Sequence, residues 1–401
     1  MQGKIRGLMA IALSAGLLSG CVGLPLPQGY HDARTTAPAG GAAAGVPSFS
    51  GDGGEQGTSL KGGERDDNAD FAGYLEYLSK YRQGPDGNGP WLDVTERYPL
   101  RIVDEASKSV PNATVTVSHG SELVLSARTT ADGRLYFHPK AFPAIATSQD
   151  DLTIEVTKGG STLNRTLSRN GEPVEPFVMP GERGAIAPKL DLCFVLDVTG
   201  SMGDELGQIQ ATIGEIAFRI QSLPGAPAVR YGLVAYRDYG DAFVTLKHDF
   251  TGDLGTFKQR LNALSAMGGG DTPEALNPAL NEALTQLSWD DGEAVRLTFV
   301  VGDAPPNLTR PEGVPAHPQD VPYTTSMVKA LERGIKIVPL AASGLDGFGE
   351  FVFRQLAQFT GGKFLFLTYG GQTSHQVGPV QENNLDDLVV GIVKAELSHL
   401  E

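Results

Sequence analysis

The C-terminal half of the chain alternates between short apolar runs and stretches of helical periodicity. Because strands that are apolar throughout are buried on both faces, helices must cover both sides of the sheet they form. The pattern therefore predicts an α/β fold with a doubly wound, mostly parallel sheet over residues 189–401. We expect strands at 190–196, 229–236, 295–301, 335–340 and 363–367, an antiparallel edge strand at 243–250, and helices at 206–220, 254–264, 273–287, 323–333, 348–358 and 385–397.

The preceding stretch has a different pattern. Between about Trp91 and Met179, short alternating runs are separated by turn residues such as ADG and KGG, and the runs lie at 100–103, 113–117, 123–125, 135–137 and 152–156. This predicts a small all-β sandwich of antiparallel strands. The sequence pattern VPNATVTV…TTADGRLYF resembles the carboxypeptidase regulatory-like sandwich family, and this resemblance implies a spacer or accessory domain. With a short helix at 71–81 expected to pack on it, we assign 71–182 to this domain.

The N-terminal residues have the pattern of a secretory signal peptide. A basic start and a short apolar run lead to Leu18-Ser19-Gly20-Cys21, which resembles the lipobox of bacterial lipoproteins. The resemblance implies cleavage after residue 20 and a lipid on Cys21 that anchors the chain to the membrane. Val22 is not the aspartate that retains such proteins at the inner membrane, which favours the outer membrane, with the chain facing the periplasm or the cell surface. Residues 21–70, rich in Gly, Ala and Pro, are expected to form a flexible tether.

Charge and side-chain chemistry exclude several functions. The net charge of −15 argues against binding nucleic acid. The seven histidines are scattered without metal-binding spacing, and there is no nucleophile elbow or phosphate-binding loop. Cys193 lies in an apolar run, so no disulfide is expected. The sequence therefore indicates a protein without enzymatic activity or a small-molecule substrate, and a hydrolase is the weaker reading.

Three separate segments bring oxygen ligands to one edge of the expected sheet. The first strand ends in DVTGS, which carries Asp197, Thr199 and Ser201. A glycine-rich loop, GGGDTPEA, contains Glu274, and a third strand is followed by Asp303. The carboxyl ends of parallel strands form the ligand crevice of open sheets. Hydroxyls and carboxylates are the ligands that a hard ion such as Mg²⁺ prefers.

Asp-x-Thr-x-Ser after an apolar strand resembles the metal-ion-dependent adhesion site of von Willebrand factor type A domains, a Rossmann-like family. The resemblance implies a Mg²⁺ or Mn²⁺ ion held by a principal set of five residues, with one coordination position open for a carboxylate from a partner protein. Thr272 is an alternative ligand, but the form Asp-x-Pro-Glu is similar to integrin β-type domains, in which the glutamate binds the ion. The implied principal set is Asp197, Thr199, Ser201, Glu274 and Asp303.

The integrin β-type pattern also implies flanking sites, one of them for Ca²⁺. Asp204 and Glu205 match the position of an adjacent cation site. Asp238, Asp271, the Pro273 carbonyl and Glu274 match a second one. Favourable charge at a helix start and a polar turn after a strand explain the same residues without any ion.

Two non-enzymatic functions follow. In the first, a membrane-anchored adhesin or receptor-like module captures an acidic side chain of a protein partner. In the second, the chain is a structural or assembly subunit of a cell-envelope complex, and the ion stabilises its fold. Residues 304–325, rich in Pro and polar side chains, are expected to overhang the metal and to set partner choice.

Overall fold

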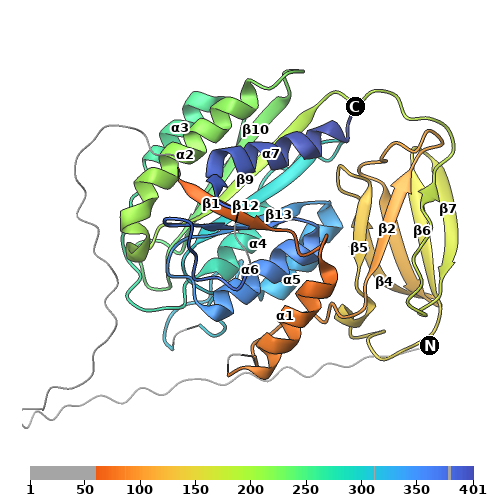
Figure 1. Ribbon diagram of the computed structural model, residues 1–401, viewed down its shortest axis with the longest axis horizontal. Coiled ribbons are helices and arrows are strands. Elements are labelled where there is room, and N and C mark those ends of the chain that lie inside the picture. The colour runs from red at the N-terminus through yellow and green to blue at the C-terminus, as the bar shows by residue number, and fades with distance from the viewer. Residues whose placement is uncertain (1–59, 86, 311, 378–380) are drawn as a thin grey trace, which may run out of the picture. The chain divides into compact units, whose positions relative to one another are not determined.

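The computed structural model describes residues 60–85, 87–310, 312–377 and 381–401, which belong to one compact unit that extends from Gly57 to Glu401 (Figure 1). The predicted signal peptide, the lipidation site Cys21 and most of the predicted tether lie outside the described residues.

The central element is a mixed sheet of eight strands in the order β11-β10-β9-β12-β13-β14-β1-β15. The neighbours β10, β9, β12, β13 and β14 are parallel, whereas β11, β1 and β15 pair antiparallel. The expected α/β sheet is thus present, with three antiparallel strands where one was expected. The strands are β1 (Lys61–Arg65), β9 (Lys189–Asp197), β10 (Ala228–Tyr236), β11 (Thr245–Thr251), β12 (Val295–Gly302), β13 (Lys336–Ala341), β14 (Phe364–Leu367) and β15 (Asn383–Asn384).

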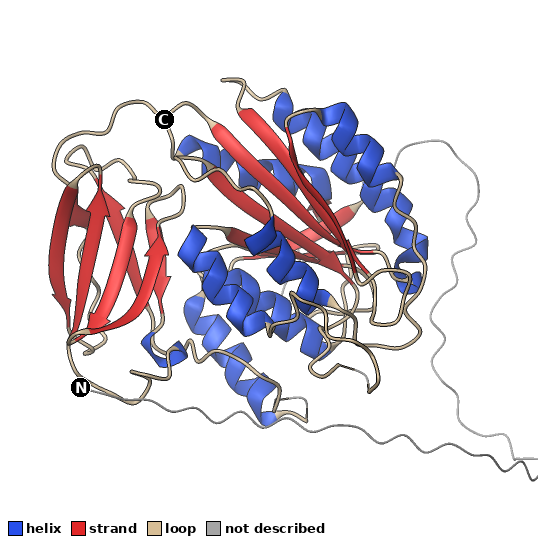
Figure 2. Ribbon diagram, turned by 180° about the vertical axis from the view of Figure 1, so that it is seen from behind, coloured by secondary structure: helices blue, strands red, loops and turns tan. Residues whose placement is uncertain are grey.

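Helices cover both faces of this sheet (Figure 2). Alternate residues of β9 belong to different cores: Leu192 and Phe194 pack with α2, α3 and α7, while Cys193 and Val195 pack with α1, α4, α5 and α6. Cys193 is free and buried, as expected. Within the described residues, no helix combines the length and the apolar character needed to cross a membrane. The helices are α1 (Phe71–Gln83), α2 (Gly203–Gln221), α3 (Leu254–Asn262), α4 (Leu276–Gln286), α5 (Tyr323–Arg333), α6 (Gly347–Thr360) and α7 (Leu385–Ser398).

The N-terminal segment differs from its expected role. The predicted tether extended to Asp70, whereas β1 carries residues 61–65 into the sheet between β14 and β15. Helix α1 was expected to pack on the β-rich part. It does contact that part, since Phe71 lies under the guanidinium of Arg97 just before β2, but its Tyr81 ring also stacks on Phe351 of α6 with centroids 4.3 Å apart. The segment therefore bridges both parts of the chain.

The β-rich part contains two small sheets, in the orders β5-β2-β8 and β4-β3-β6-β7. The strands expected at 100–103, 113–117, 123–125, 135–137 and 152–156 are all present. The hairpin partner β7 and the short β8 were not expected, and β8 runs parallel to β2. The strands are β2 (Tyr98–Val103), β3 (Thr114–His119), β4 (Glu122–Arg128), β5 (Arg134–Phe137), β6 (Leu152–Lys158), β7 (Ser161–Leu167) and β8 (Phe177–Val178), with a 3₁₀ turn, η1 (Pro139–Ala141).

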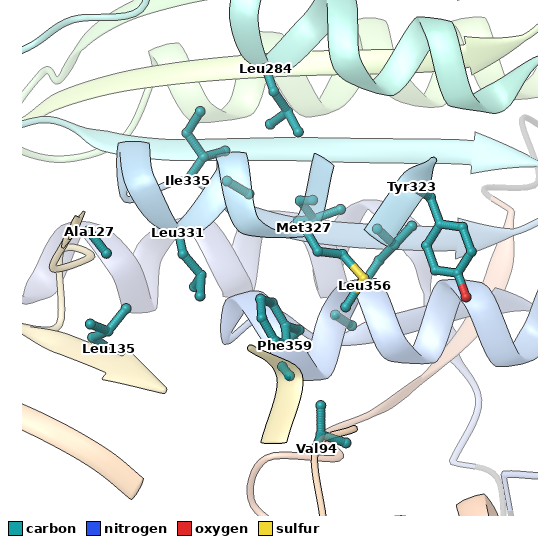
Figure 3. Close-up of a cluster of buried hydrophobic side chains, with 14 of the residues drawn as sticks. Val94, Ala127, Leu135, Leu284, Tyr323, Met327, Leu331, Ile335, Leu356 and Phe359 are labelled. Atoms are coloured by element: carbon teal, nitrogen blue, oxygen red, sulfur yellow. The ribbon is translucent and has the colours of Figure 1, made fainter. Parts of the chain in front are cut away.

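A buried apolar cluster joins the two parts (Figure 3). Leu135 of β5 and Ala127 of β4 belong to the same core as Leu331 of α5 and Phe359 of α6. At the amino end of β13, the buried Lys336 ammonium lies 3.0 Å from Asp132, which belongs to the turn before β5. The β-rich part therefore contacts the amino-end edge of the large sheet, opposite to the edge at which β9 and β12 end.

Candidate metal centre

The predicted ligands converge where β9, β10 and β12 end side by side. Val301 of β12 pairs with Leu196 of β9, so the residues that follow, Gly302 and Asp197, are neighbours. A Cβ atom at Gly302 would lie 3.3 Å from Asp197 Oδ2 and 2.6 Å from the hydroxyl of Tyr236. The missing side chain at Gly302 thus leaves room for the Asp197 carboxylate and the Tyr236 phenol beside Asp303.

The loop after β9 organises the first three candidates. Thr199 donates to Asp197 Oδ1 from both its backbone N–H, at 2.9 Å, and its hydroxyl, at 2.6 Å. The Thr199 and Ser201 hydroxyl oxygens lie 3.1 Å apart. A 3₁₀ turn, η2 (Gly200–Met202), then leads into α2. Asp197 and Thr199 are buried while Ser201 is exposed, so the set opens to solvent on the Ser201 side.

The glycine-rich loop lies directly against this turn. The Gly200 N–H donates to the Gly268 carbonyl at 3.0 Å, and residues 268–270 all have positive φ. A Cβ atom at Gly269 would lie 2.9 Å from Glu274 Oε1 and 3.3 Å from Thr199 Cβ. Only glycine adopts this backbone without strain and also allows the Glu274 carboxylate to approach Thr199.

Backbone pairing between the second and third loops holds Glu274 in place. Its N–H donates to the Pro305 carbonyl at 3.0 Å, and its carbonyl accepts from the Asn307 N–H at 2.8 Å. The Asn307 amide donates to Asp238 Oδ1 at 2.7 Å and to the Pro273 carbonyl at 3.1 Å. Residues 305–307, at the start of the segment expected to overhang the site, therefore connect it to Glu274.

Three carboxylate oxygens at this edge are buried and have no hydrogen-bond partner among the described residues: Asp197 Oδ2, Glu274 Oε2 and Asp303 Oδ1. Burial is the main cause that raises the pKa of Asp197 to about 7, and the charge of Asp303 adds to it. Burial, followed by the charges of Asp197, Asp238 and Asp303, raises the pKa of Glu274 to about 9. The pKa of Asp303 is also raised, mainly by burial, although hydrogen bonding to Ser201 opposes the shift.

This donor set suits a hard divalent cation. Unpaired buried carboxylates are costly, and a cation among them removes both their repulsion and their desolvation cost. The described residues contain no group of three or more His, Cys, Asp or Glu side chains that could hold a metal on their own. The candidate centre therefore depends on the Thr199 and Ser201 hydroxyls as well as on the acids, which favours an oxygen-ligated ion over zinc.

Some of the predicted flanking residues are hydrogen bonded within the protein, and others are exposed to solvent. Glu205 accepts hydrogen bonds from the Ser343 and Tyr369 hydroxyls, and Asp238 accepts from Asn307. Asp204, Asp271 and the alternative ligand Thr272 are exposed to solvent. Hydrogen bonds within the protein thus occupy part of the oxygen set that the flanking Ca²⁺ sites would use.

Two residues of the site were missed in the sequence. Asp241 Oδ2 accepts from the Gly269 N–H at 2.8 Å and from the Asp238 N–H at 3.1 Å, so it positions the glycine loop. Asn307 connects three segments through its amide. Asp241 stands in a polar turn after a strand and Asn307 in a Pro-rich loop, and neither setting distinguishes them from ordinary loop residues. The signal that could have been used is their position in the sequence, because Asp241 follows Asp238 and Asn307 follows Asp303 within a few residues.

Residues 191–312 match the family described as von Willebrand factor A domain. The von Willebrand factor A domain-containing protein 7 of Mus musculus is 41% identical over 101 residues, which cover 25% of this chain and 10% of that protein. Hemicentin-1 of Homo sapiens is 37% identical over 93 residues, 23% of this chain and 2% of that protein. The chain thus spans a tenth or less of the length of these curated relatives.

Solved structures give only a distant likeness. Proximal thread matrix protein 1 from the mussel byssus has a TM-score of 0.35 and 14% identity, with 53% of this chain and 46% of that chain covered. The pilus adhesin SpaC from Lactobacillus rhamnosus GG has a TM-score of 0.38 and 11% identity, with coverage of 62% and 32%. The family match, by contrast, includes all three loops of the candidate metal centre. The segment that carries this centre is therefore similar to the von Willebrand factor A domain family over residues 191–312.

Proposed function

We propose that this chain is a metal-ion-dependent protein-binding module, of the adhesin or receptor-like kind. Domains of this family are typically non-enzymatic protein-interaction modules. The observation that carries the proposal is the set of three buried, unpartnered carboxylate oxygens beside two hydroxyls at one edge of the sheet. Such a set is unfavourable unless a cation joins it.

The residues that would hold Mg²⁺ or Mn²⁺ are Asp197, Thr199, Ser201, Glu274 and Asp303. When bound, the ion supplies a positive charge and a coordination position for the carboxylate of a protein partner. The protein orients the ligands: Thr199 fixes one oxygen of Asp197, and Gly269 leaves space for Glu274. The exposure of Ser201 supports access for a partner from the solvent side.

The second candidate function is a structural or assembly subunit in which the ion only stabilises the fold. The raised pKa values of Asp197 and Glu274 favour this alternative equally, because a cation would relieve the same repulsion. The two functions differ in one respect. A binding module loses its partner when the ion is removed, whereas an assembly subunit keeps the partner and loses stability.

We further propose that a lipid on Cys21 anchors the chain in the cell envelope, with the outer membrane as the favoured location. We also propose that Ca²⁺ occupies a flanking site near Asp238.

We propose an accessory role for the β-rich part, in line with its resemblance to carboxypeptidase regulatory-like sandwiches. Its position at the amino-end edge of the sheet supports a role that is separate from the metal centre.

Titration calorimetry of the protein with Mg²⁺ and Mn²⁺ tests whether the candidate metal centre binds an ion. We expect saturable binding that Ser201→Ala weakens at least tenfold. Ser222→Ala is the matched control, because this hydroxyl at the far end of α2 donates only to the Phe218 carbonyl. The absence of saturable binding of either ion, or equal binding by the Ser201 and Ser222 variants, would contradict the proposed centre.

Partner capture distinguishes the two functions. Envelope proteins retained by the wild-type chain in Mg²⁺ are compared with those retained in EDTA and by Ser201→Ala. We expect a partner that is lost under both conditions, and that is also lost when one acidic residue of the partner is changed to its amide. A partner retained in EDTA, together with a lower melting temperature, would favour the assembly function.

A further inference from the structure

A second candidate binding site lies at the opposite edge of the sheet. A groove of about 790 Å³ separates the outer face of β2 and β5 from helix α7 and from the amino ends of β12 and β13. This volume is in the range of small-ligand and short-peptide sites. The groove shares no residue with the candidate metal centre.

One wall of the groove is cationic. Arg97, Pro99 and Arg101 alternate along the chain with the buried Tyr98 and Leu100, so all three project from the outer face. Their spacing places Arg97 and Arg101 about 13 Å apart along the strand direction. The wall is therefore a row of guanidinium groups.

The row contains an unfavourable pair. Arg134 of β5 is the direct cross-strand neighbour of Arg101, and both face the groove. Like charges directly opposite each other destabilise a sheet. The Arg101 side chain has no ion pair or hydrogen bond among the described residues, and Arg134 has only Asp132 at 3.9 Å. An anion between the two guanidinium groups would remove this repulsion.

Arg97 adds a third, partly desolvated cation. Its guanidinium lies 3.7 Å from the Phe71 ring centroid and 5.4 Å from that of Tyr136. It donates to the carbonyl and the side-chain oxygen of Asn68, and no carboxylate lies within ion-pair distance among the described residues. Burial lowers the pKa of Arg97. Its remaining N–H groups are available to an acidic ligand.

The opposite wall carries an apolar stripe, with Asp387, Glu396 and His399 of the same segment around it. Leu388, Gly391, Ile392 and Ala395 of α7 follow helical spacing and line the groove. A ligand that fits both walls presents acidic groups to the arginines and apolar groups to α7. An extended peptide with alternating acidic and apolar residues has this arrangement, since successive side chains point to opposite sides.

The acidic side chains that line the groove are already engaged. Glu64 pairs with Lys363, Asp387 with Arg219, and Asp132 and Glu396 with Lys336. Asp66 accepts from the backbone N–H groups of Asn68 and Ala69. The acidic side chains therefore leave the arginines free to bind an acidic ligand.

We propose that this groove binds an extended acidic peptide segment, whose carboxylates pair with Arg97, Arg101 and Arg134 and whose alternate apolar side chains pack on α7. The site is independent of the metal centre. It would give the protein a second binding surface, in which the β-rich part supplies the charge and α7 supplies the apolar wall.

Fluorescence anisotropy with a labelled, end-capped Glu-Leu-Glu-Leu-Glu peptide tests the proposal in the presence of EDTA. We expect saturable binding that weakens at high salt. The Gln-Leu-Gln-Leu-Gln peptide should not bind, and inorganic phosphate should compete only weakly. No saturable binding of the acidic peptide, equal binding of the neutral peptide, or tight phosphate binding without peptide binding would overturn the proposal.

The decisive variant is Arg101→Glu. It should weaken peptide binding at least tenfold while leaving the melting temperature unchanged or higher, because it converts the repulsive pair with Arg134 into an attractive one. Arg260→Glu, on α3 outside the groove, makes the same change in net charge and should bind the peptide like the wild type. If Arg101→Glu binds as well as Arg260→Glu, the groove is not the binding site.

Discussion

Asp67 and Arg354 form a buried ion pair between residues 287 positions apart in the sequence. The guanidinium donates to both carboxylate oxygens, at 2.7 and 2.8 Å, and each side chain is only 1% exposed. The same guanidinium lies 3.6 Å from the Tyr77 ring centroid. This pair fixes the turn between β1 and α1 onto α6, so the N-terminal segment is an integral part of the α/β core.

Asp67→Ala should destabilise the protein strongly. The variant removes the bidentate partner of Arg354 and leaves it only the longer contact with the buried Glu350, at 3.4 Å; breaking a buried pair in this way costs about 3–5 kcal/mol. The free energy of unfolding, measured by urea denaturation, checks this. Glu332→Ala breaks a solvent-exposed pair with Lys329 and should cost no more than about 1 kcal/mol. Similar losses in the two variants would show that the Asp67 pair contributes little.

A chain that begins at Lys189 should be less stable than one that begins at residue 58. It would lack β1, α1 and the β-rich part, so it would expose the edge of β14 and the apolar surface of α5 and α6 that is buried in Figure 3. We expect a lower melting temperature and more aggregation, measured by calorimetry and light scattering. Equal stability of the two chains would mean that the part from Lys189 onward folds without the N-terminal segments.

The sequence predicts the α/β part well and the N-terminal strand not at all. Runs such as 190–196 are apolar on both faces, which leaves few alternatives to a central strand. The strand KGGER has two glycines and three charged residues, and its own composition favours a loop. It becomes a strand only because β14 and β15 offer pairing partners. The glycine at position 62 permits this pairing, since a Cβ atom there would lie 2.8 Å from the Phe366 carbonyl oxygen.

Gly269→Ala should weaken Mg²⁺ binding. The added methyl group would lie 2.9 Å from Glu274 Oε1, and the positive φ of 68° adds backbone strain. Gly225→Ala is the control, because φ is 86° there but a Cβ atom would have open space. Calorimetric titration should give at least a tenfold loss of affinity for the Gly269 variant and wild-type affinity for the control. A normal affinity in both would remove Glu274 from the ligand set.

Mg²⁺ should raise the melting temperature, and EDTA should reverse the effect. An ion that binds only the folded state stabilises it by about 2.7 kcal/mol when its concentration is 100 times the dissociation constant. In Asp303→Asn the shift should largely disappear, because one of the three carboxylates that have an unpartnered buried oxygen becomes a neutral amide. Thermal unfolding in Mg²⁺ and in EDTA measures both shifts. If the variant is stabilised as much as the wild type, Asp303 is not a ligand.

His138 should make the protein sensitive to acid. Burial lowers its pKa to about 3, while an unfolded histidine titrates near 6.5. Between these values the unfolded chain binds a proton that the folded chain does not, so this contribution is complete above pH 6.5 and is lost as the pH falls towards 3. The slope is up to about 1.4 kcal/mol per pH unit. In His138→Gln, unfolding free energies between pH 6.5 and 4 should show a smaller slope, and an unchanged slope would assign the acid sensitivity to other groups.

The candidate centre was predictable only in part, for a physical reason. Asp197, Thr199 and Ser201 are close in sequence, and the carboxyl ends of neighbouring strands must meet, which brings Asp303 to them. Asn307 acts through contacts with Asp238 and Pro273 that depend on the path of a long loop. The presence of a buried strand follows from the hydrophobic pattern, whereas the path of a loop depends on many weak contacts that have no local signature.

Leu60 lies at the same edge of the sheet as the candidate metal centre, because β1 runs antiparallel to β14 and begins where β14 ends. The proposed anchor at Cys21 would be separated from Leu60 by residues 22–59, a stretch that spans at most about 130 Å when fully extended. Residues 22–59 would therefore join the folded part at the edge that carries the ion-binding residues, so a partner bound there would lie beside the point of attachment.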